Sequence, residues 1–356
     1  MAPLEIKLAD FTPRFRGGGY VMSYVTQRVL YSRVLRLDAG DSRFGYGEII
    51  SNPGLDLPGI RALEDAALKP LGTVSLENLP AHIPRLRSRN SELSGLAFAL
   101  ETAYLDLISR HSGLPLYALL GGQLSADVVD YLSISCGEPE VMRERVQADG
   151  HERAVIQIKL EGKDMNLDMA RIDACMSALQ PAQSVLIDFN GALSPAAARV
   201  IISQYSDRRI MWEEPCYSYE ENRALVESTG ARLLFDQCIK SLNGFARACA
   251  EGAMAGVCIK PMSLGGLAIA RAARDLCADS GVAVRIDGLW CGPVATTSIL
   301  HLAVGMPAEL LIAGCNLYEP LVLEEDWGGM VSKPGGRIAP TDKPGHGVTP
   351  PEVLWR

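Results

Sequence analysis

The chain has 356 residues, of which 48% are hydrophobic and 21% are charged, proportions typical of a folded globular protein. A formal net charge of −8 and an isoelectric point near 5.3, without a basic patch, argue against a nucleic-acid partner. No apolar run is long enough to cross a membrane and no signal peptide is recognisable, so we expect a cytoplasmic protein.

The nine cysteines are scattered, and none pairs with another Cys or with a His at the spacing of a zinc site. This pattern predicts reduced and mostly buried thiols. Four of them lie near predicted strand ends: Cys216, Cys238, Cys291 and Cys315. A nucleophilic thiol is nevertheless disfavoured, because no His stands in a position to activate one.

The first 50 residues or so have the alternating pattern of strands, with a hairpin signal at residues 38–41. A glycine-rich segment, residues 16–23, joins two of these strands and contains Tyr20. It is either an ordinary connection or a mobile lid, and composition favours neither. Residues 59–120 are predicted to be mainly helical, and residues 327–348 carry no periodicity.

Between these ends the sequence alternates strand and helix. Six apolar runs end at a polar residue, at intervals of about 25 residues, which fits one strand, one helix and two short loops. The six residues are Lys159, Asp188, Glu213, Asp236, Lys260 and Asp287. Such a repeat predicts a parallel barrel whose strand ends meet at one mouth, where the chemistry takes place. Ordinary charges at the strand ends of any α/β protein are the alternative, which six repeats in register disfavour.

Three acids on consecutive predicted strands, Asp188, Glu213 and Asp236, are hard oxygen donors of the kind that Mg²⁺ prefers. No His or Cys replaces any of them, which disfavours zinc. Of the neighbours Glu213 and Glu214 we assign Glu213 as the ligand, because the strand pleat points the two in opposite directions. Asn190 shares a strand face with Asp188.

Lys159 and Lys260 flank these acids, one on either side. Burial beside a divalent cation disfavours the charged form of a lysine, so each is a candidate general base near neutral pH. Two such lysines on opposite faces of a carboxylate substrate would each exchange a proton with its α-carbon, while the metal stabilises the enediolate. For Lys159 a structural salt bridge is the alternative.

At these positions the sequence resembles the enolase superfamily, and within it the muconate lactonizing enzyme subgroup. The resemblance rests on residues 95–106, 113–116, 119–122, 157–159, 188–190, 213–215, 236–237, 260–266 and 344–348. It implies an α/β fold: an α+β N-terminal capping domain, residues 1–122, over a modified (β/α)₈ TIM barrel, residues 123–323. The C-terminal segment, residues 324–356, would complete the cap. The resemblance also implies Mg²⁺, the acid/base pair Lys159 and Lys260, a small carboxylate substrate and a homo-oligomer.

Two residues depart from the family pattern. Gln157 stands where the family usually has a lysine, which weakens electrostatic help for the substrate carboxylate, and Gln237 stands where a glutamate is usual. Residues 287–293 and 299–303 resemble members that act on proline derivatives, namely cis-3-hydroxyproline dehydratases and proline-betaine epimerases. Pro293 replaces an acid that those members often have.

This narrower resemblance makes seven residues candidate substrate contacts: Tyr20, Gln157, Asn190, Asp287, Trp290, Asn316 and Tyr318. Asp287 would hold a cyclic ammonium and Trp290 would face that cation. The alternatives are a helix cap for Asp287 and a core position for Trp290.

We therefore expect a Mg²⁺-dependent enzyme that abstracts the proton α to a carboxylate. Dehydration of a 3-hydroxyproline-like amino acid is the first choice. Racemisation or epimerisation of proline or its betaine is a close alternative, and cycloisomerisation of a muconate-type diacid is the third. A non-catalytic relative that only binds a metal or a carboxylate is disfavoured by the intact lysine pair.

Overall fold

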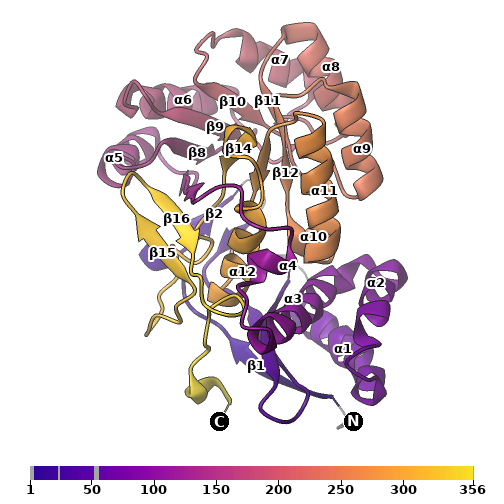
Figure 1. The fold of residues 1–356 in the computed structure, drawn as a ribbon. Coiled ribbons are helices and arrows are strands. Elements are labelled where there is room, and N and C mark those ends of the chain that lie inside the picture. Colours follow the sequence, from indigo (N-terminus) through magenta and orange to yellow (C-terminus); the bar gives the residue numbers. More distant parts are fainter. Residues whose placement is uncertain (1–3, 23–24, 52–55, 356) are drawn as a thin grey trace.

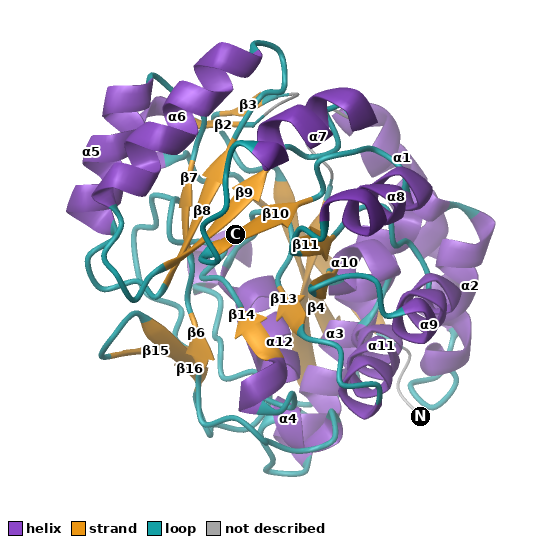
Figure 2. Ribbon diagram, turned by 90° about the horizontal axis from the view of Figure 1, so that it is seen from above, coloured by secondary structure: helices purple, strands orange, loops and turns teal. Residues whose placement is uncertain are grey.

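The structure, a computed structural model, describes residues 4–22, 25–51 and 56–355. Its centre is a sheet of eight parallel strands in chain order, curled into a barrel (Figure 2). A parallel bridge between Asp130 and Gly314 links the two edges of the sheet. The strands are β7 Leu132–Ile134, β8 Val155–Lys159, β9 Ser184–Asp188, β10 Ile210–Glu213, β11 Leu233–Phe235, β12 Gly256–Ile259, β13 Val284–Ile286 and β14 Leu311–Ala313.

Helices follow the first seven barrel strands and cover the outside of the sheet (Figure 2). They are α5 Pro139–Asp149, α6 Met165–Ala178, α7 Pro195–Ser203, α8 Tyr219–Thr229, α9 Leu242–Glu251, the short α10 Pro261–Leu264, α11 Leu267–Asp279 and α12 Pro293–Ala303. Their starts are encoded locally, as where Ser218 and Glu221 form a capping box on α8. The described chain after β14 has no α-helix, so the predicted barrel is confirmed in a modified form.

The N-terminal part forms a cap of three antiparallel strands and three helices, below the barrel in Figure 1. The strands are β1 Glu5–Phe11, β4 Ser32–Asp38 and β5 Phe44–Ile50; the helices are α1 Leu57–Leu68, α2 Leu79–Arg89 and α3 Ser94–His111, and the short α4 Leu116–Leu119 follows. Helix α3 lies directly on β5 because Gly47 leaves room: a Cβ there would be 1.9 Å from the Ala99 carbonyl oxygen. A small hairpin, β2 Tyr20–Val21 and β3 Thr26–Gln27, continues the cap toward the barrel mouth.

The C-terminal segment contacts both barrel and cap. A hairpin of β15 Met330–Lys333 and β16 Arg337–Pro340 pairs with the short strand β6 Val128–Val129 at the start of the barrel. Gly345 then exchanges backbone hydrogen bonds with Leu114 and Leu116 beside the cap helices. The predicted domain limits at residues 122 and 323 stay a prediction, because residues 324–355 belong to neither part alone. None of the described helices is both long and apolar enough to span a membrane.

Candidate active site

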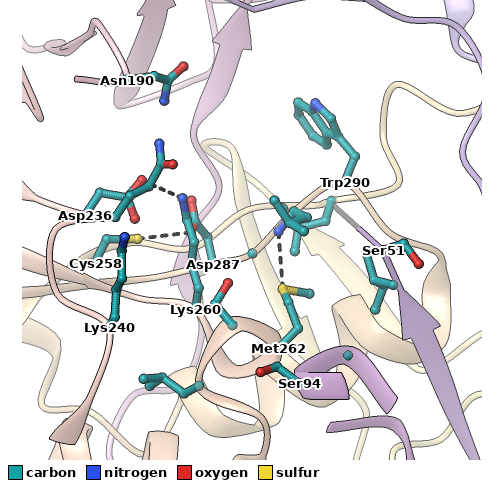
Figure 3. Close-up of a pocket in the computed structure, with 18 of the residues that line it drawn as sticks. Ser51, Ser94, Asn190, Asp236, Lys240, Cys258, Lys260, Met262, Asp287 and Trp290 are labelled. Carbon is teal, nitrogen blue, oxygen red and sulfur yellow. Dashed lines mark hydrogen bonds and ion pairs between the residues drawn. The ribbon is translucent and has the colours of Figure 1, made fainter. Parts of the chain in front are cut away.

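A cavity of about 490 Å³ opens at the carboxyl ends of the barrel strands, between the barrel and the cap. Its floor includes Lys159, Asp236 and Lys260 from the barrel, and Tyr20 and Ser94 of the cap contribute to its wall. Figure 3 shows Lys260 directed at Asp236 within this space. The position agrees with the general rule that a parallel barrel binds its ligands at this end.

The three predicted metal ligands lie at adjacent strand ends. Asp188 ends β9 and Glu213 ends β10, where the two residues are partners in the strand register. Asp236 directly follows β11. All three are at most 3% exposed. Asp236 lines the cavity, whereas Asp188 and Glu213 lie one layer deeper.

Asp188 is held by its own strand end and by Lys159. The Asn190 backbone N–H donates to Asp188 Oδ1 at 2.7 Å and its Nδ2 to Oδ2 at 3.1 Å. Asn190 turns back in this way because its φ of 49° is left-handed, a conformation that Asn tolerates well. The Lys159 ammonium donates to the same Oδ2 atom. Burial raises the pKa of Asp188 to about 6, and the nearby Glu213 carboxylate adds to that rise.

Glu213 points into the barrel, and Glu214 points elsewhere. The guanidinium of Arg285 donates to both oxygens of Glu213, at 2.5 Å for Oε2, and Gln157 Nε2 donates to Oε2 at 2.7 Å. Glu214 instead accepts from the backbone N–H of Asp236 at 2.5 Å. The pKa of Glu213 is lowered to about 2, because Arg285 and Lys159 outweigh the effect of burial.

The two lysines lie on opposite sides of the acids, Lys159 at the end of β8 and Lys260 directly after β12. Lys260 forms an ion pair with Asp236, with 2.5 Å between Nζ and Oδ2, and Lys159 forms the equivalent ion pair with Asp188. Burial alone would lower the pKa of each lysine, but the paired aspartate more than offsets it and holds each pKa above its ordinary value. Each lysine must therefore part from its carboxylate before it can accept a proton.

The donor set fits Mg²⁺ by its chemistry, because three buried carboxylates and no nitrogen or sulfur ligand converge from adjacent strand ends. In the arrangement seen, cationic side chains occupy these carboxylates. Within the described residues, no three acidic, His or Cys side chains are already gathered closely enough to hold a metal. An ion bound by Asp188, Glu213 and Asp236 would thus replace the lysine contacts to the two aspartates.

Five of the seven predicted substrate contacts line the cavity: Tyr20, Gln157, Asn190, Asp287 and Trp290. The Tyr20 hydroxyl forms a hydrogen bond with the Ser133 hydroxyl. The Tyr20 and Trp290 rings make an edge contact, with 4.9 Å between ring centroids. Burial raises the pKa of the Tyr20 hydroxyl to about 12, so it remains protonated at neutral pH. Trp290 is only half-buried, so it packs against the cap and also faces the cavity.

The other two candidates, Asn316 and Tyr318, lie in the loop after β14 and are not part of the cavity lining that the described residues form. The Asn316 backbone N–H donates to Asp130 Oδ1 at 2.7 Å, which ties this loop to the start of the barrel. Tyr318 packs against a buried apolar cluster that includes Phe15, Tyr20 and Leu321. Their role in substrate binding stays a prediction.

Sequence reasoning missed Arg285, which reaches the centre of the site from β13. It stands inside the apolar run Val284–Ile286, where a strand pattern predicts a core position. The signal was present, because Arg285 and Asp287 are two residues apart and so share a strand face. Ser133 was also missed; it donates to Gln157 Oε1 at 2.6 Å and turns that amide toward the acids.

Comparison with known proteins agrees with this fold and site. A sequence model of the family described as enolase C-terminal domain-like matches residues 139–353. Cis-3-hydroxy-L-proline dehydratase of Roseibium aggregatum is 30% identical over 90% of this chain and 89% of its own length. L-Ala-D/L-Glu epimerase of Clostridium acetobutylicum is 26% identical over 70% of either chain.

Among solved structures, a member of the enolase superfamily from Roseovarius nubinhibens, crystallised in complex with magnesium, superposes with a TM-score of 0.87. The two proteins are 26% identical, and the match covers 99% of this chain and 96% of the other. This chain therefore belongs to the enolase superfamily, and it is an enzyme of that superfamily. The family prediction made from the strand-end motifs is confirmed.

Proposed function

We propose that this enzyme removes the proton α to the carboxylate of a small amino-acid-like substrate, with Mg²⁺ as cofactor, and that it dehydrates a cis-3-hydroxyproline-type amino acid. One observation carries the proposal: two lysines from strands on opposite sides of three buried acids face one cavity. The dehydratase of Roseibium aggregatum, matched over most of both chains, supports the narrower choice.

In the proposed reaction, the residues of this chain bind the substrate, enclose it and move two protons. When bound by Asp188, Glu213 and Asp236, Mg²⁺ would supply the positive charge that stabilises the enediolate form of the substrate carboxylate. Tyr20 and Trp290, whose rings meet edge to face, both line the cavity and would shield one side of a bound substrate from solvent.

The lysine that faces the α-hydrogen parts from its aspartate, loses its ammonium proton to solvent and, as a neutral amine, takes the α-proton. The other lysine, still an ammonium, gives a proton to the β-hydroxyl, and the C–O bond breaks as the α,β double bond forms. One water leaves, and the enamine product tautomerises to a ketimine. No electrons are gained or lost, so no redox partner is needed.

Epimerisation of proline or its betaine is the second candidate, and a specific observation favours it. Both lysines line the cavity, as a reaction on both faces of one α-carbon requires. In that reaction the second lysine returns a proton to the opposite face of the α-carbon, and no bond to a β-substituent breaks. Cycloisomerisation of a muconate-type diacid is the third candidate; no feature of the site singles it out.

The test is a screen in D₂O with Mg²⁺, using cis-3-hydroxyproline and both enantiomers of proline and of its betaine. Nuclear magnetic resonance reports deuterium at the α-carbon and loss of water in the same sample. The first choice predicts a ketimine product from cis-3-hydroxyproline and little racemisation of proline. Rapid interconversion of enantiomers without water loss would instead establish the epimerase, and no α-exchange with any ligand that binds would refute both.

A further inference from the structure

Arg285 is a fully buried cation at the bottom of the cavity, with a partner on each side. Its guanidinium grips Glu213 through both carboxylate oxygens. On the other side Asp287 Oδ2 lies 3.1 Å from Nε, as an ion pair whose N–H is not directed at the oxygen. The guanidinium carbon also lies 5.2 Å from the ring centre of Tyr131.

Asp287 is itself held by Tyr131 and Cys258, two further side chains that line the same cavity. The Tyr131 hydroxyl donates to Asp287 Oδ2 at 2.7 Å, and Cys258 Sγ lies 3.1 Å from Oδ1 (Figure 3). The carboxylate is 2% exposed. A substrate ammonium would have to compete with these three neighbours for the same two oxygens. The contacts therefore form a relay, from Tyr131 through Asp287 and Arg285 to Glu213.

Glu213 is paired with an arginine, whereas the other two predicted metal ligands are paired with lysines. Asp188 and Asp236 are paired with lysines, whose ammonium groups can lose a proton and move away. Arg285 remains charged at any working pH, and its planar fork fixes the plane of the carboxylate it binds. Glu213 is thus held in one orientation whether or not the lysines are engaged in proton transfer.

We propose that Arg285 is a positioning residue for the Glu213 carboxylate, and that Asp287 anchors Arg285 rather than binding the substrate ammonium. The inference rests on the proposed function in so far as Glu213 is taken to be a metal ligand. Groups that orient a metal ligand from behind commonly change metal affinity by 10- to 100-fold when they are replaced.

The experiment titrates the full-length protein with Mn²⁺ alone and follows free Mn²⁺ by electron paramagnetic resonance. Arg285→Lys keeps the charge and removes the fork, so any change in electrostatic repulsion of the ion is small. We expect roughly 10-fold or greater weakening of Mn²⁺ binding. Tyr131→Phe, which removes only the hydroxyl, and Asp287→Asn should weaken binding in the same direction by less.

Arg274→Lys is the matched control. Arg274 is also buried, at 2% exposure, but it lies on α11 and donates to the backbone oxygens of Leu302 and Leu120, at 3.0 and 2.9 Å. It should bind Mn²⁺ like the wild type. Circular dichroism of every variant identifies any loss of fold, and the milder Tyr131→Phe decides the matter if Arg285→Lys does not fold.

The outcomes separate this inference from the function on which it rests. If the wild type binds no Mn²⁺, the Mg²⁺-dependent function fails at once. If the wild type binds it and folded Arg285→Lys binds equally well, only the role of Arg285 is refuted. At saturating Mg²⁺, Asp287→Asn should leave the KM for substrate within about twofold of the wild type. A raised KM with unchanged Mn²⁺ affinity would make Asp287 a substrate contact and overturn the proposed relay.

Discussion

At the scale of single residues, the pairing of each lysine with an aspartate sets the conditions for catalysis. Lys159 and Lys260 are only partly exposed, with 12% and 17% of their side-chain surface accessible, and Asp188 and Asp236 keep them charged. The expectation that a divalent cation beside each lysine disfavours its charged form stays a prediction. A cation that takes over Asp188 and Asp236 would release the ammonium groups and lower their pKa values by like-charge repulsion.

The lysines should differ in importance between the two leading reactions. With a dehydratase, Lys→Ala at the α-facing position lowers kcat by roughly 10²- to 10⁴-fold, and the other lysine contributes less. With an epimerase, Lys159→Ala and Lys260→Ala both stop conversion, while each variant still exchanges the α-proton of one enantiomer. Deuterium uptake measured with each enantiomer distinguishes these cases. Undiminished exchange in both variants would remove the lysines from the mechanism.

Asp236 combines two roles, since it is a predicted metal ligand and the partner of Lys260. Asp236→Asn keeps the size of the side chain but removes its charge, so turnover should be abolished while circular dichroism shows an intact fold. The wild type should lose activity in EDTA and regain it with Mg²⁺. Full activity in EDTA would contradict the metal assignment, and Asp149→Asn on the exposed end of α5 serves as control.

Individual site residues were predictable where they interrupt a local pattern. Lys159, Asp188 and Glu213 each end an apolar strand run, so position and chemistry could be inferred together. Arg285 was missed because it lies within such a run. The desolvation cost of burying its charge is offset by the ion pairs with Glu213 and Asp287. The pairing with Glu213 of β10 is a tertiary contact without a local signature, and only the nearby Asp287 gave an indication in the sequence.

At the scale of elements, the cap is attached to the barrel by two acids that bind helix N-termini. Glu48 of β5 accepts from the N–H groups of Gly292 and Ala295 at 2.6 and 3.1 Å, at the start of α12. Glu101 of α3 accepts from Ala268 at 3.0 Å, at the start of α11. These N–H groups have no acceptor within their own helices, and the cap glutamates supply one.

Glu48 should make stability pH-dependent. Burial raises its pKa to about 7 from an ordinary 4.5, so between those values the unfolded chain loses its proton and the folded chain does not. Stability therefore falls as pH rises from 4.5 to 7, by up to roughly 3 kcal/mol. Glu48→Gln removes this contribution, and its thermal midpoint should fall less than that of the wild type between pH 5 and 7.5. Exposed Glu325→Gln should behave like the wild type; identical profiles for Glu48→Gln would contradict the prediction.

The glycine-rich segment joins the cap to the cavity through Tyr20. Gly17, Gly18 and Gly19 have positive φ values of 62°, 84° and 145°. The last of these, at Gly19, is a backbone conformation that only glycine adopts easily. Ser23 of the same predicted loop lies outside the described residues. We predict that this segment closes over bound substrate, so a tight-binding ligand should protect it from limited proteolysis. Equal cleavage with and without the ligand would favour an ordinary hairpin connection.

Elements were predictable from sequence to different degrees. The barrel strands and helices show local periodicity and helix caps, and the regular spacing of the strand–helix units predicts the barrel. The hairpin of β15 and β16 lacks such a pattern, because its pairing partner β6 lies some 200 residues earlier and supplies the missing backbone hydrogen bonds. Each strand of this hairpin is only four residues long, which is too short for a clear alternating pattern.

At the scale of the whole molecule, one buried carboxylate of the cap holds the returning C-terminal segment in place. Asp106 of α3 is fully buried and accepts from Tyr46 N and His346 N, both at 2.9 Å, and from Arg110 Nε at 2.7 Å. Arg110 also donates to the Val348 carbonyl at 2.7 Å. A strand of the cap sheet, a cap helix and the returning segment therefore meet at a single side chain.

Replacing Asp106 should loosen this junction. Asp106→Ala leaves two buried N–H groups and the Arg110 guanidinium without their acceptor, at a cost of roughly 3–5 kcal/mol in the free energy of unfolding. Because His346 loses its tie to α3, residues 341–355 should become the first site of cleavage by a protease, identified by mass spectrometry.

The matched control for this junction is Asp342→Ala. Asp342 also links the returning segment to the cap, by accepting from the Tyr117 hydroxyl at 2.8 Å, but it is exposed. Its loss should change the free energy of unfolding by about 0.5 kcal/mol or less and leave the cleavage pattern as in the wild type. Similar small effects for both variants would show that the segment is held by its backbone contacts to Leu114 and Leu116, with Asp106 contributing little. A large effect of Asp106→Ala alone would show instead that one carboxylate couples the cap to the end of the chain.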